Sequence, residues 1–385
     1  MTEQLKLKLN DSKATRWGAL VIVAFTMMAA YYVNDVVAPL KTMLETDLAW
    51  SSTDFGFFTG GYSFLNVFFL MLIWGGLILD RFGIRFTGKL ATILMVGGTA
   101  LEYYAMTGLA GADATLFGIN EIFGYKTGVF VAFAGYSIFG VGAEVAGITV
   151  SKIIAKWFKG KELATAMGVQ VALARIGSQA GYAVAIPLAR AFGISTPVLL
   201  GLVLLLGGMI AFFIFAVMDK KLDKQMEAAA IAAGTEDEEE KFSFKDVKNI
   251  LVNPGFWLIA LLCVLFYSCV FPFQKFASEL MIIKYGINEN VAGTFAGLPA
   301  LGALILTPVF GGFIDKRGKS ASIMLLGSAM LICVHFIYAI PDINYWLVAI
   351  VLMIILGIAF SLVPSAMWPA VAKIFPVSQL GTAYA

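Results

Sequence analysis

Residues 76–85 read Gly-Leu-Ile-Leu-Asp-Arg-Phe-Gly-Ile-Arg and separate two long apolar runs. Residues 311–318 read Gly-Gly-Phe-Ile-Asp-Lys-Arg-Gly and lie at the matching place in the second half of the chain, after the second apolar run of that half. Self-similarity of this kind is the signature of an internal repeat. We therefore predict two parallel repeats of six helices each, in which this short polar stretch joins the second helix to the third.

The repeated stretch has a physical rationale at the cytoplasmic side of a membrane. Gly76 lets two helices approach closely, and Gly83 permits a tight turn. Asp80 can sit against a helix N-terminus in the facing bundle, where the helix dipole favours an anion, while Arg81 and Arg85 stay in the positive cytoplasmic layer. This predicts a cytoplasmic gate, with an ordinary positively charged loop as the alternative. The expected gate residues of the two repeats are Gly76, Asp80, Arg81, Gly83, Arg85, Asp315, Lys316 and Gly318.

The composition independently indicates a membrane protein. Of the 385 residues, 60% are hydrophobic and 14% are charged, whereas soluble domains carry about 25% charged residues. The chain holds 32 Phe and 39 Gly. Uncharged runs recur that reach the length of about 20 residues that a transmembrane helix needs. We therefore predict an all-α, multi-pass membrane protein.

Runs long enough to cross about 30 Å of hydrocarbon predict ten spans. They run from Trp17 to Leu40, Phe55 to Leu79, Phe86 to Leu109, Gly128 to Trp157, Glu162 to Ala189, Thr196 to Met218, Phe256 to Leu280, Val291 to Ile314, Ser320 to Ile340 and Ile343 to Ile374. We expect a six-helix bundle over residues 1–218, a cytoplasmic linker over 219–255 and an incomplete second bundle over 256–385, with the chain ending at the start of helix 11. Two parallel repeats of this kind occur in one large class of secondary transporters.

Lysine and arginine are distributed unevenly between the two sides of the predicted helices. With the N-terminus in the cytoplasm, the cytoplasmic segments hold 21 of the 27 basic residues and the opposite side holds five, while Arg175 lies inside a span. Cytoplasmic loops of membrane proteins carry an excess of basic residues. The distribution therefore predicts a cytoplasmic N-terminus.

Several functional classes are excluded by the same sequence. A formal net charge of +2 with scattered basic residues offers no face for nucleic acid. Cys263, Cys269 and Cys333 all lie in apolar runs, so neither a disulfide framework nor a metal cluster is expected. A single histidine, His335, leaves no Ser-His-Asp set, and the sequence has no phosphate-binding loop for ATP. We expect no enzyme activity, no cofactor and no bound metal.

Two ionisable residues, Glu144 and Arg175, are predicted to lie deep in the membrane, where charge is expensive and usually functional. Both fall about 20 Å from the cytoplasmic ends of adjacent antiparallel helices, at a rise of about 1.5 Å per residue. A carboxylate can receive an ammonium group, and a guanidinium can hold a carboxylate with two hydrogen bonds. The pair suits the main-chain ends of a short peptide. A permanent buried salt bridge is the alternative.

Further polar residues are candidates for the cavity or for coupling. Asp35 can serve as a proton site or as part of an outer gate, or it can be a helix-end carboxylate exposed to water. Packing is the alternative role for the aromatic candidates. The candidates are Asp35, Gln170, Gln179, Tyr182 and Trp368.

Three more stretches carry a resemblance to a known family. They are Gly142-Ala143-Glu144, residues 156–163 (Lys-Trp-Phe-Lys-Gly-Lys-Glu-Leu) and residues 174–178 (Ala-Arg-Ile-Gly-Ser). Together with residues 76–85 they resemble the major facilitator superfamily and, within it, the branch of lysosomal dipeptide transporters. The resemblance covers nearly the whole chain. It implies two six-helix bundles, movement of dipeptides, and substrate contacts by Glu144 and Arg175.

The sequence as a whole therefore predicts a secondary or facilitative transporter for dipeptides or similar small zwitterions, working by alternating access. An organic-anion transporter of the same fold and a non-transporting ligand sensor are the alternatives. The expected partners are a small-molecule or dipeptide substrate and the lipid bilayer, with room for an accessory membrane protein. The expected location is the cell (inner) membrane, or an endolysosomal membrane in a eukaryote. Uniport and proton coupling both stay open, and the single sequon, Asn10-Asp11-Ser12, falls on the predicted cytoplasmic side.

Overall fold

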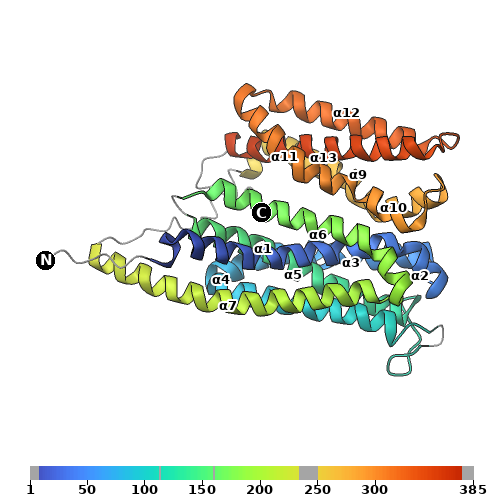
Figure 1. Ribbon diagram of the computed structural model, residues 1–385, viewed down its shortest axis with the longest axis horizontal. Helices are drawn as coiled ribbons and strands as arrows, with labels where there is room; N and C mark the ends of the chain where they lie inside the picture. Colours follow the sequence, from blue (N-terminus) through green and yellow to red (C-terminus); the bar gives the residue numbers. More distant parts are fainter. Residues whose placement is uncertain (1–7, 112–113, 159–160, 234–249, 375–385) are drawn as a thin grey trace. The chain divides into compact units, whose positions relative to one another are not determined.

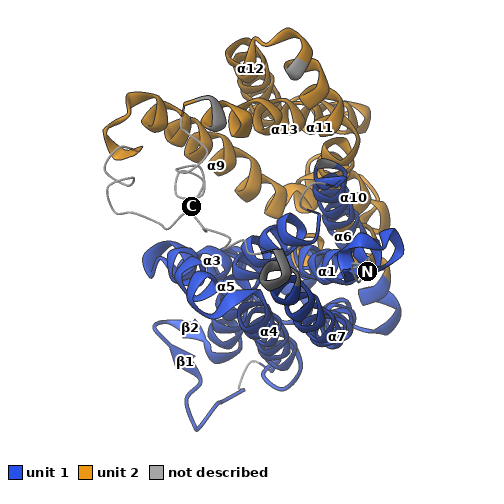
Figure 2. Ribbon diagram, turned by 90° about the vertical axis from the view of Figure 1, so that its left-hand side faces the viewer, with its two compact units in different colours: residues 1–37, 42–181, 188–238 blue, residues 38–41, 182–187, 239–385 orange. Residues whose placement is uncertain are grey.

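The structure is a computed structural model, and it describes residues 8–111, 114–158, 161–233 and 250–374. It divides into two compact units (Figure 2). Unit 1 holds Met1–Val37, Thr42–Gly181 and Leu188–Glu238, and unit 2 holds Ala38–Lys41, Tyr182–Pro187 and Glu239–Ala385. Part of the expected linker and the expected opening of an eleventh helix lie outside the described residues.

Unit 1 is a bundle of long helices (Figure 1). Their starts follow local capping chemistry: the Ser12 side chain accepts a hydrogen bond from the Thr15 amide at the start of α1, and Ser51 forms a capping box with Asp54 at the start of α3. The elements that lie wholly or largely in unit 1 are η1 (Leu9–Asp11), α1 (Lys13–Val36), α2 (Lys41–Asp47), α3 (Ser52–Phe68), α4 (Met71–Thr107), α5 (Thr127–Trp157), α6 (Leu163–Phe192) and α7 (Thr196–Ala233).

Unit 2 takes two short segments from the first half of the sequence. In one of them, Lys41 is buried and forms an ion pair with Glu279. In the other, the Tyr182 hydroxyl donates a hydrogen bond to the Gln274 carbonyl at 3.2 Å. The remaining elements of unit 2 are η2 (Ala38–Leu40), α9 (Pro254–Ile283), α10 (Glu289–Ala296), α11 (Leu298–Arg317), α12 (Ser320–Ala339) and α13 (Trp346–Ile374).

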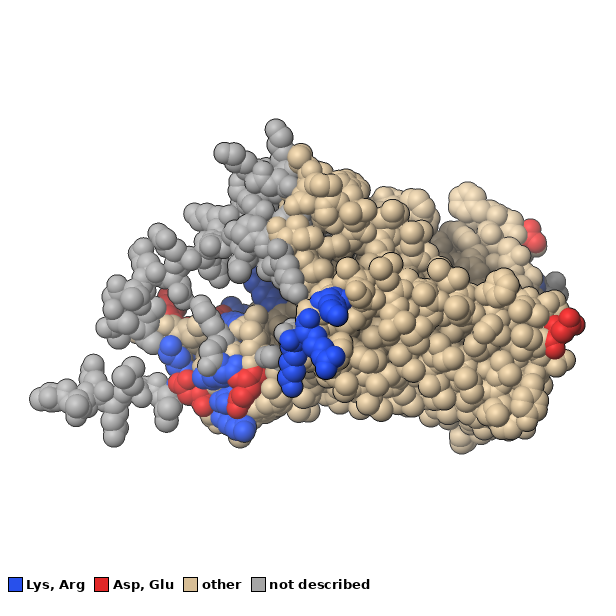
Figure 3. Space-filling view, turned by 90° about the horizontal axis from the view of Figure 1, so that it is seen from above, with Lys and Arg blue, Asp and Glu red and all other residues tan. Residues whose placement is uncertain are grey.

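Within the described residues, seven helices are long and apolar enough to cross a membrane, or up to eight if a bent pair counts as one span. Two features account for the difference from the ten expected runs. Helix α4 contains Gly83 at φ +75° and ψ 173°, so it joins the end of one expected run to the next. Helix α6 carries the polar residues Gln170, Arg175 and Gln179 and is not among the seven. On the face shown in Figure 3, charged side chains are few, and a broad surface carries none.

In the expected span from Phe55 to Leu79, the helix is broken near its middle. Helix α3 ends at Phe68 and α4 begins at Met71, with a bend of 58° between them. Leu70 has φ +53°, a left-handed conformation that costs energy for a side chain other than glycine. The stretch contains neither Pro nor Gly at the break, so no local sequence signal marks it.

A small hairpin precedes α5. Strand β1 (Glu121–Ile122) pairs antiparallel with β2 (Tyr125–Lys126), with Glu121 opposite Lys126. Leu116 and Ile119 form an isolated bridge just before it, with hydrogen bonds of 3.0 Å in both directions. Two tight turns therefore follow one another within eleven residues.

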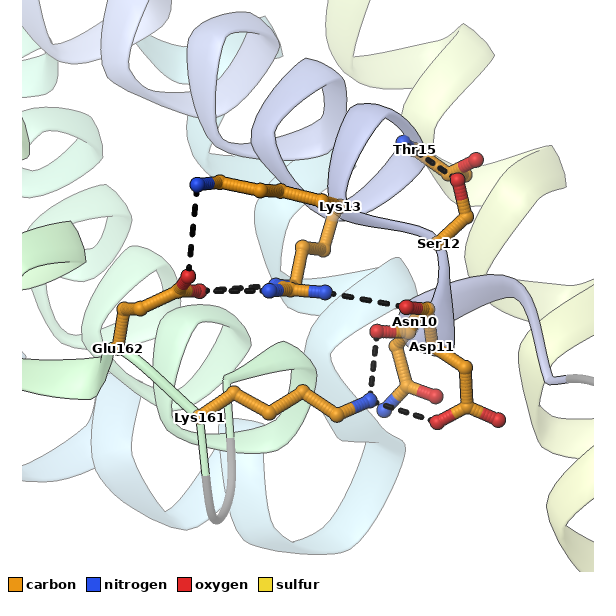
Figure 4. A network of polar contacts seen from close by, with 8 residues as sticks. Asn10, Asp11, Ser12, Lys13, Thr15, Lys161 and Glu162 are labelled. Atoms are coloured by element: carbon orange, nitrogen blue, oxygen red, sulfur yellow. Dashed lines mark hydrogen bonds and ion pairs between the residues drawn. The ribbon is translucent and has the colours of Figure 1, made fainter.

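The N-terminal segment is tied to the loop before α6 by a polar network (Figure 4). The Lys161 ammonium donates to the Asn10 carbonyl and to the Asp11 carboxylate, each at 2.7 Å. The Arg16 guanidinium donates to Glu162 at 2.7 and 3.1 Å and to the Asp11 carbonyl at 3.1 Å. Hydrogen bonds from these cations hold the pKa of both Asp11 and Glu162 below their usual values. The network thus fixes the start of α1 against the loop between α5 and α6.

This network predicts a stability loss in acid. A carboxylate whose pKa is lowered by folding adds stability that is complete above its usual pKa, 4.5 for Glu162, and is lost as the pH falls through the lowered value. We expect the melting temperature of the purified protein to exceed that of Glu162→Gln by a constant amount from pH 7 to about pH 5, and the difference to vanish in stronger acid. The exposed Glu227, on α7, gives the matched control: Glu227→Gln should follow the wild-type curve. A gap between wild type and Glu162→Gln that is independent of pH would contradict the assignment.

Candidate functional site

Glu144 is held by a tyrosine of a neighbouring helix in unit 1. It lies on α5, is half-buried, and accepts a hydrogen bond of 2.7 Å from the Tyr62 hydroxyl on α3. The two helices approach closely here because position 140 is glycine: a Cβ at Gly140 would lie 2.3 Å from the Tyr62 carbonyl oxygen. A carboxylate has about four acceptor sites, so the Tyr62 bond leaves most of the Glu144 capacity for a ligand.

Arg175 lies against a second tyrosine. It is half-buried on α6, and its guanidinium carbon is 5.6 Å from the centre of the Tyr31 ring on α1. Tyr31 also interacts electrostatically with Glu144 and Asp35. The side chain of Tyr31 therefore lies within electrostatic range of Glu144, Arg175 and Asp35, the three ionisable residues proposed from the sequence for substrate binding or coupling.

Asp35 belongs to a chain of hydrogen bonds at the end of α1. The Tyr136 hydroxyl donates to the Asn34 carbonyl at 2.7 Å and to the Asn34 side-chain oxygen at 3.1 Å. The Asn34 amide in turn donates to Asp35 at 2.9 Å. The centre of the Tyr136 ring lies 5.6 Å from that of Tyr62. The hydrogen bonds around Asp35 and those around Glu144 are therefore joined through two neighbouring tyrosine rings.

The resulting cluster combines two carboxylates and one guanidinium in a tyrosine-lined, partly desolvated setting. Low local dielectric strengthens hydrogen bonds to charged ligand groups. A guanidinium grips a carboxylate with a planar fork, and a carboxylate binds an ammonium group. The arrangement can therefore recognise both ends of a zwitterion. Within the described residues, no group of three His, Cys, Asp or Glu side chains could hold a metal ion.

The other expected cavity residues are spread over both units. Gln170 and Gln179 are half-buried on α6. Tyr182 is 2% exposed and is packed within unit 2, where its hydroxyl bonds to the Gln274 carbonyl. Trp368 lies on α13 and is 39% exposed. Of these four residues, Tyr182 has a packing role in the structure, within unit 2.

The first copy of the repeated stretch is held by charge pairs within unit 1. Asp80 is exposed and forms an ion pair with Lys152 on α5 at 2.8 Å. Gly83 takes up the positive φ at the sharp turn inside α4. Gly76 is half-buried on α4, and Arg81 is exposed beside the ring of Phe82. Arg85 forms ion pairs with acidic residues of α7.

Arg85 takes part in a buried cluster that sequence reasoning missed. Asp219 on α7 is fully buried and receives contacts from the Lys156 ammonium at 2.8 Å, the Trp157 ring N–H at 3.0 Å and the Arg85 guanidinium at 3.3 Å. Asp223, one turn later, forms ion pairs with the same Lys156 and Arg85. Helices α4, α5 and α7 are thereby joined at one point.

The second copy of the repeated stretch ends α11. Gly318 has φ +69° directly after the helix. Its φ is positive, like that of Gly83 in the first copy. Lys316 is exposed. The Asp315 side chain lies outside what the structure describes, so its expected gate contact stays a prediction.

Tyr31, Tyr62, Asn34 and Tyr136 are site residues that the sequence analysis did not select. They lie in apolar runs of a chain with 13 Tyr and 32 Phe. In such runs an aromatic residue more often packs against its neighbours than binds a ligand. The one usable signal is that each has a hydroxyl or amide inside a predicted span, where buried polar groups need a partner. Only the fold shows that the partners are Glu144, Arg175 and Asp35.

Comparisons with known proteins agree on the family. A family model described as the Major Facilitator Superfamily matches residues 20–385. The human protein named lysosomal dipeptide transporter MFSD1 is 29% identical over 385 aligned positions, covering 96% of this chain and 76% of the relative. The Gallus gallus protein of the same name is 33% identical over 263 positions, which cover 65% of this chain and 56% of the relative.

Solved structures show the same fold at low sequence identity. The inward-open xylose transporter XylE from E. coli has a TM-score of 0.65 and 16% identity, covering 96% of this chain and 85% of the other. A peptide transporter POT in complex with sulfate has a TM-score of 0.64 and 14% identity, covering 95% and 84%. At such identities the likeness concerns the fold alone.

Proposed function

Because the chain belongs to the major facilitator superfamily, we propose that it moves dipeptides or similar small zwitterions across its membrane by alternating access. It is a multi-pass transporter rather than an enzyme. The observation that carries the substrate proposal is the pair of charges held by separate tyrosines: Glu144 by Tyr62 at 2.7 Å and Arg175 over Tyr31 at 5.6 Å. The dipeptide function printed in the names of the curated relatives supports it.

In the proposed binding mode, each charge receives one end of the substrate. The N-terminal ammonium donates to the Glu144 carboxylate, while Tyr62 keeps that carboxylate in place. The C-terminal carboxylate accepts two hydrogen bonds from the guanidinium of Arg175, which lies over the Tyr31 ring. Because the main-chain ends are recognised, the site makes no specific contact with the two substrate side chains. Dipeptides of different sequence can therefore bind.

The transport cycle follows from the proposed domain organisation. We infer a six-helix bundle over residues 1–218, a linker over 219–255 and a second bundle over 256–385, which rock about a site near the membrane midplane. The repeated stretch around Asp80 and its counterpart around Asp315 form the proposed cytoplasmic gate. Asp35 is the proposed coupling or outer-gate residue.

The proposed membrane placement rests on charge. We infer a cytoplasmic N-terminus from the excess of basic residues in the expected cytoplasmic loops. The proposed location is the cell membrane, the inner one in a bacterium, or an endolysosomal membrane in a eukaryote, as in the names of the relatives.

Flux into liposomes tests the function. We expect the full-length protein to take up a labelled dipeptide such as alanyl-alanine faster into vesicles preloaded with unlabelled dipeptide than into empty ones, and free dipeptides to raise its melting temperature by mass action. Uptake that follows an imposed proton gradient would assign proton coupling, and uptake indifferent to it would assign uniport. Stabilisation by carboxylates or sugar phosphates but not by dipeptides would contradict the proposal in favour of an anion carrier. Dipeptide binding without flux would contradict it in favour of a sensor.

A further inference from the structure

Two consecutive turns before α5 each place a phenylalanine at their tip. Leu116 bridges Ile119 around Phe117-Gly118, and Ile122 pairs with Tyr125 around Phe123-Gly124. In both turns the two central residues have positive φ: +54° and +79° in the first, +53° and +80° in the second. We call residues 116–126 the double turn.

Phenylalanine is an unusual choice at both tips. Two-residue turns with positive φ favour Asn, Asp or Gly at their first central position, because a bulky side chain is strained there. The same costly choice is made twice, and both residues stay largely exposed: Phe117 is 95% exposed and Phe123 is 88% exposed. Exposed apolar groups mark a contact with something outside the chain where they join a larger exposed apolar surface.

Hydrogen bonds and a ring contact fix the double turn to the helices of unit 1. The Thr127 amide donates to the Asn120 carbonyl at 2.9 Å, and the Thr127 hydroxyl donates to the Ile119 carbonyl at 2.8 Å. The Tyr125 ring stacks on the Phe57 ring of α3 with 3.9 Å between centroids and 10° between planes. The exposed tips therefore have fixed positions relative to α3 and α5.

Phe123 is continuous with an aromatic row on the transmembrane helices. Its ring lies 6.0 Å from Phe130, one turn into α5, and Phe130 lies 6.1 Å from Phe133. The row continues onto α3, where Phe64 lies 5.2 Å from Phe133 and 5.3 Å from Phe68, which is 73% exposed. The aromatic row therefore runs from the exposed ring at the tip to the exposed surface of α3.

The direction of the double turn agrees with this. Figures 1 and 2 both show the segment with β1 and β2 extending sideways beyond the helices of unit 1, instead of onward along their axes. A segment that leaves the end of a transmembrane helix sideways runs over the adjacent membrane surface.

We propose that the double turn is an interfacial anchor, whose Phe117 and Phe123 side chains insert between the lipids of the leaflet next to the start of α5. Insertion places the apolar tips at the boundary of headgroups and acyl chains, where amphipathic surface segments bind. The anchor fixes the depth of α5, the helix that carries Glu144, while other parts of the transporter move. This inference is independent of the substrate.

Fluorescence quenching in lipid nanodiscs tests the anchor. In the full chain with Cys263, Cys269 and Cys333 replaced by Ala, single cysteines from Phe117→Cys, Phe123→Cys and Glu121→Cys are labelled with an environment-sensitive dye. Glu121 is the matched control, because it is exposed in the same hairpin but not at a tip. We expect iodide in the water to quench the dye at 117 and 123 at least about threefold less than at 121, and lipids with a nitroxide near the headgroup to quench it more.

Two outcomes would overturn the proposal. Equal iodide quenching at all three positions would place the tips in water. Protection from iodide without quenching by the nitroxide lipids would mean that protein covers the tips, either a second copy or another chain. Each tip is labelled in its own variant, and each variant must keep the elution profile and melting temperature of the cysteine-free parent, so the loss of one variant leaves the other to decide.

Discussion

Glu144→Gln is expected to lose affinity for dipeptides with a free N-terminus by roughly ten- to a hundredfold, the value of a hydrogen bond to a charged group. The change removes the charge but keeps an oxygen that can accept from Tyr62, the partner seen at 2.7 Å. The loss therefore reports the missing ammonium contact rather than a rearranged helix. Titration of the purified protein with a dipeptide, followed by calorimetry or by melting temperature, measures it.

Arg175→Gln should show the reciprocal pattern, with the affinity lost for dipeptides that have a free C-terminal carboxylate. N-acetylated dipeptides should be insensitive to Glu144→Gln, and C-terminal amides should be insensitive to Arg175→Gln. Tyr62→Phe is the matched control, since it keeps the Glu144 charge and removes only the donor that positions it, so its loss should be the smaller one. Blocked dipeptides that bind the wild type as tightly as free ones would contradict the assignment.

Asp219→Asn is expected to cost the largest amount of stability, about 3–5 kcal/mol or roughly 4–6 °C in melting temperature for a chain of this length. Asp219 is fully buried, and its charge offsets those of Lys156 and Arg85, which stay partly hydrated. Asparagine can still accept from Trp157 but leaves the two cations without their buried counter-charge. The melting temperature of the purified protein in detergent measures the effect.

Asp223→Asn serves as the internal control for that experiment. Asp223 pairs with the same two cations one turn along α7, but its side chain is 41% exposed. Exposed ion pairs contribute about 0–1 kcal/mol, so this variant should melt within about 2 °C of the wild type. Equal losses for the two variants would show that burial of Asp219 is not what makes it important.

The features that the sequence predicted well are those encoded by local pattern. Apolar runs of sufficient length predicted the helices, because backbone groups in lipid must be satisfied within the segment. The glycine at position 83 predicted a sharp turn, and the structure has φ +75° there. Glu144 and Arg175 were selected because isolated charges stand out in an apolar run, although their binding role stays a prediction.

The features that the sequence could not reveal depend on contacts between distant segments. The hydroxyl of Tyr62 becomes a site group only through Glu144, 82 positions away, and Asp219 becomes a structural charge only where Arg85, 134 positions away, meets it. The sequence also contains Phe-Gly at both 117 and 123, but the usual turn preference for Asn or Asp before Gly hides those turns.

The bend at Leu70 has a consequence for how this region crosses the membrane. The 17 residues of α3 span about 26 Å, and the 13 residues from Met71 to Gly83 span about 20 Å, so neither piece alone crosses about 30 Å of hydrocarbon. Only together are the two pieces long enough, so a crossing of the membrane in this region consists of two short helices set at 58° to each other. Since α5 packs against both pieces, both directions of this crossing are fixed against the helix that carries Glu144.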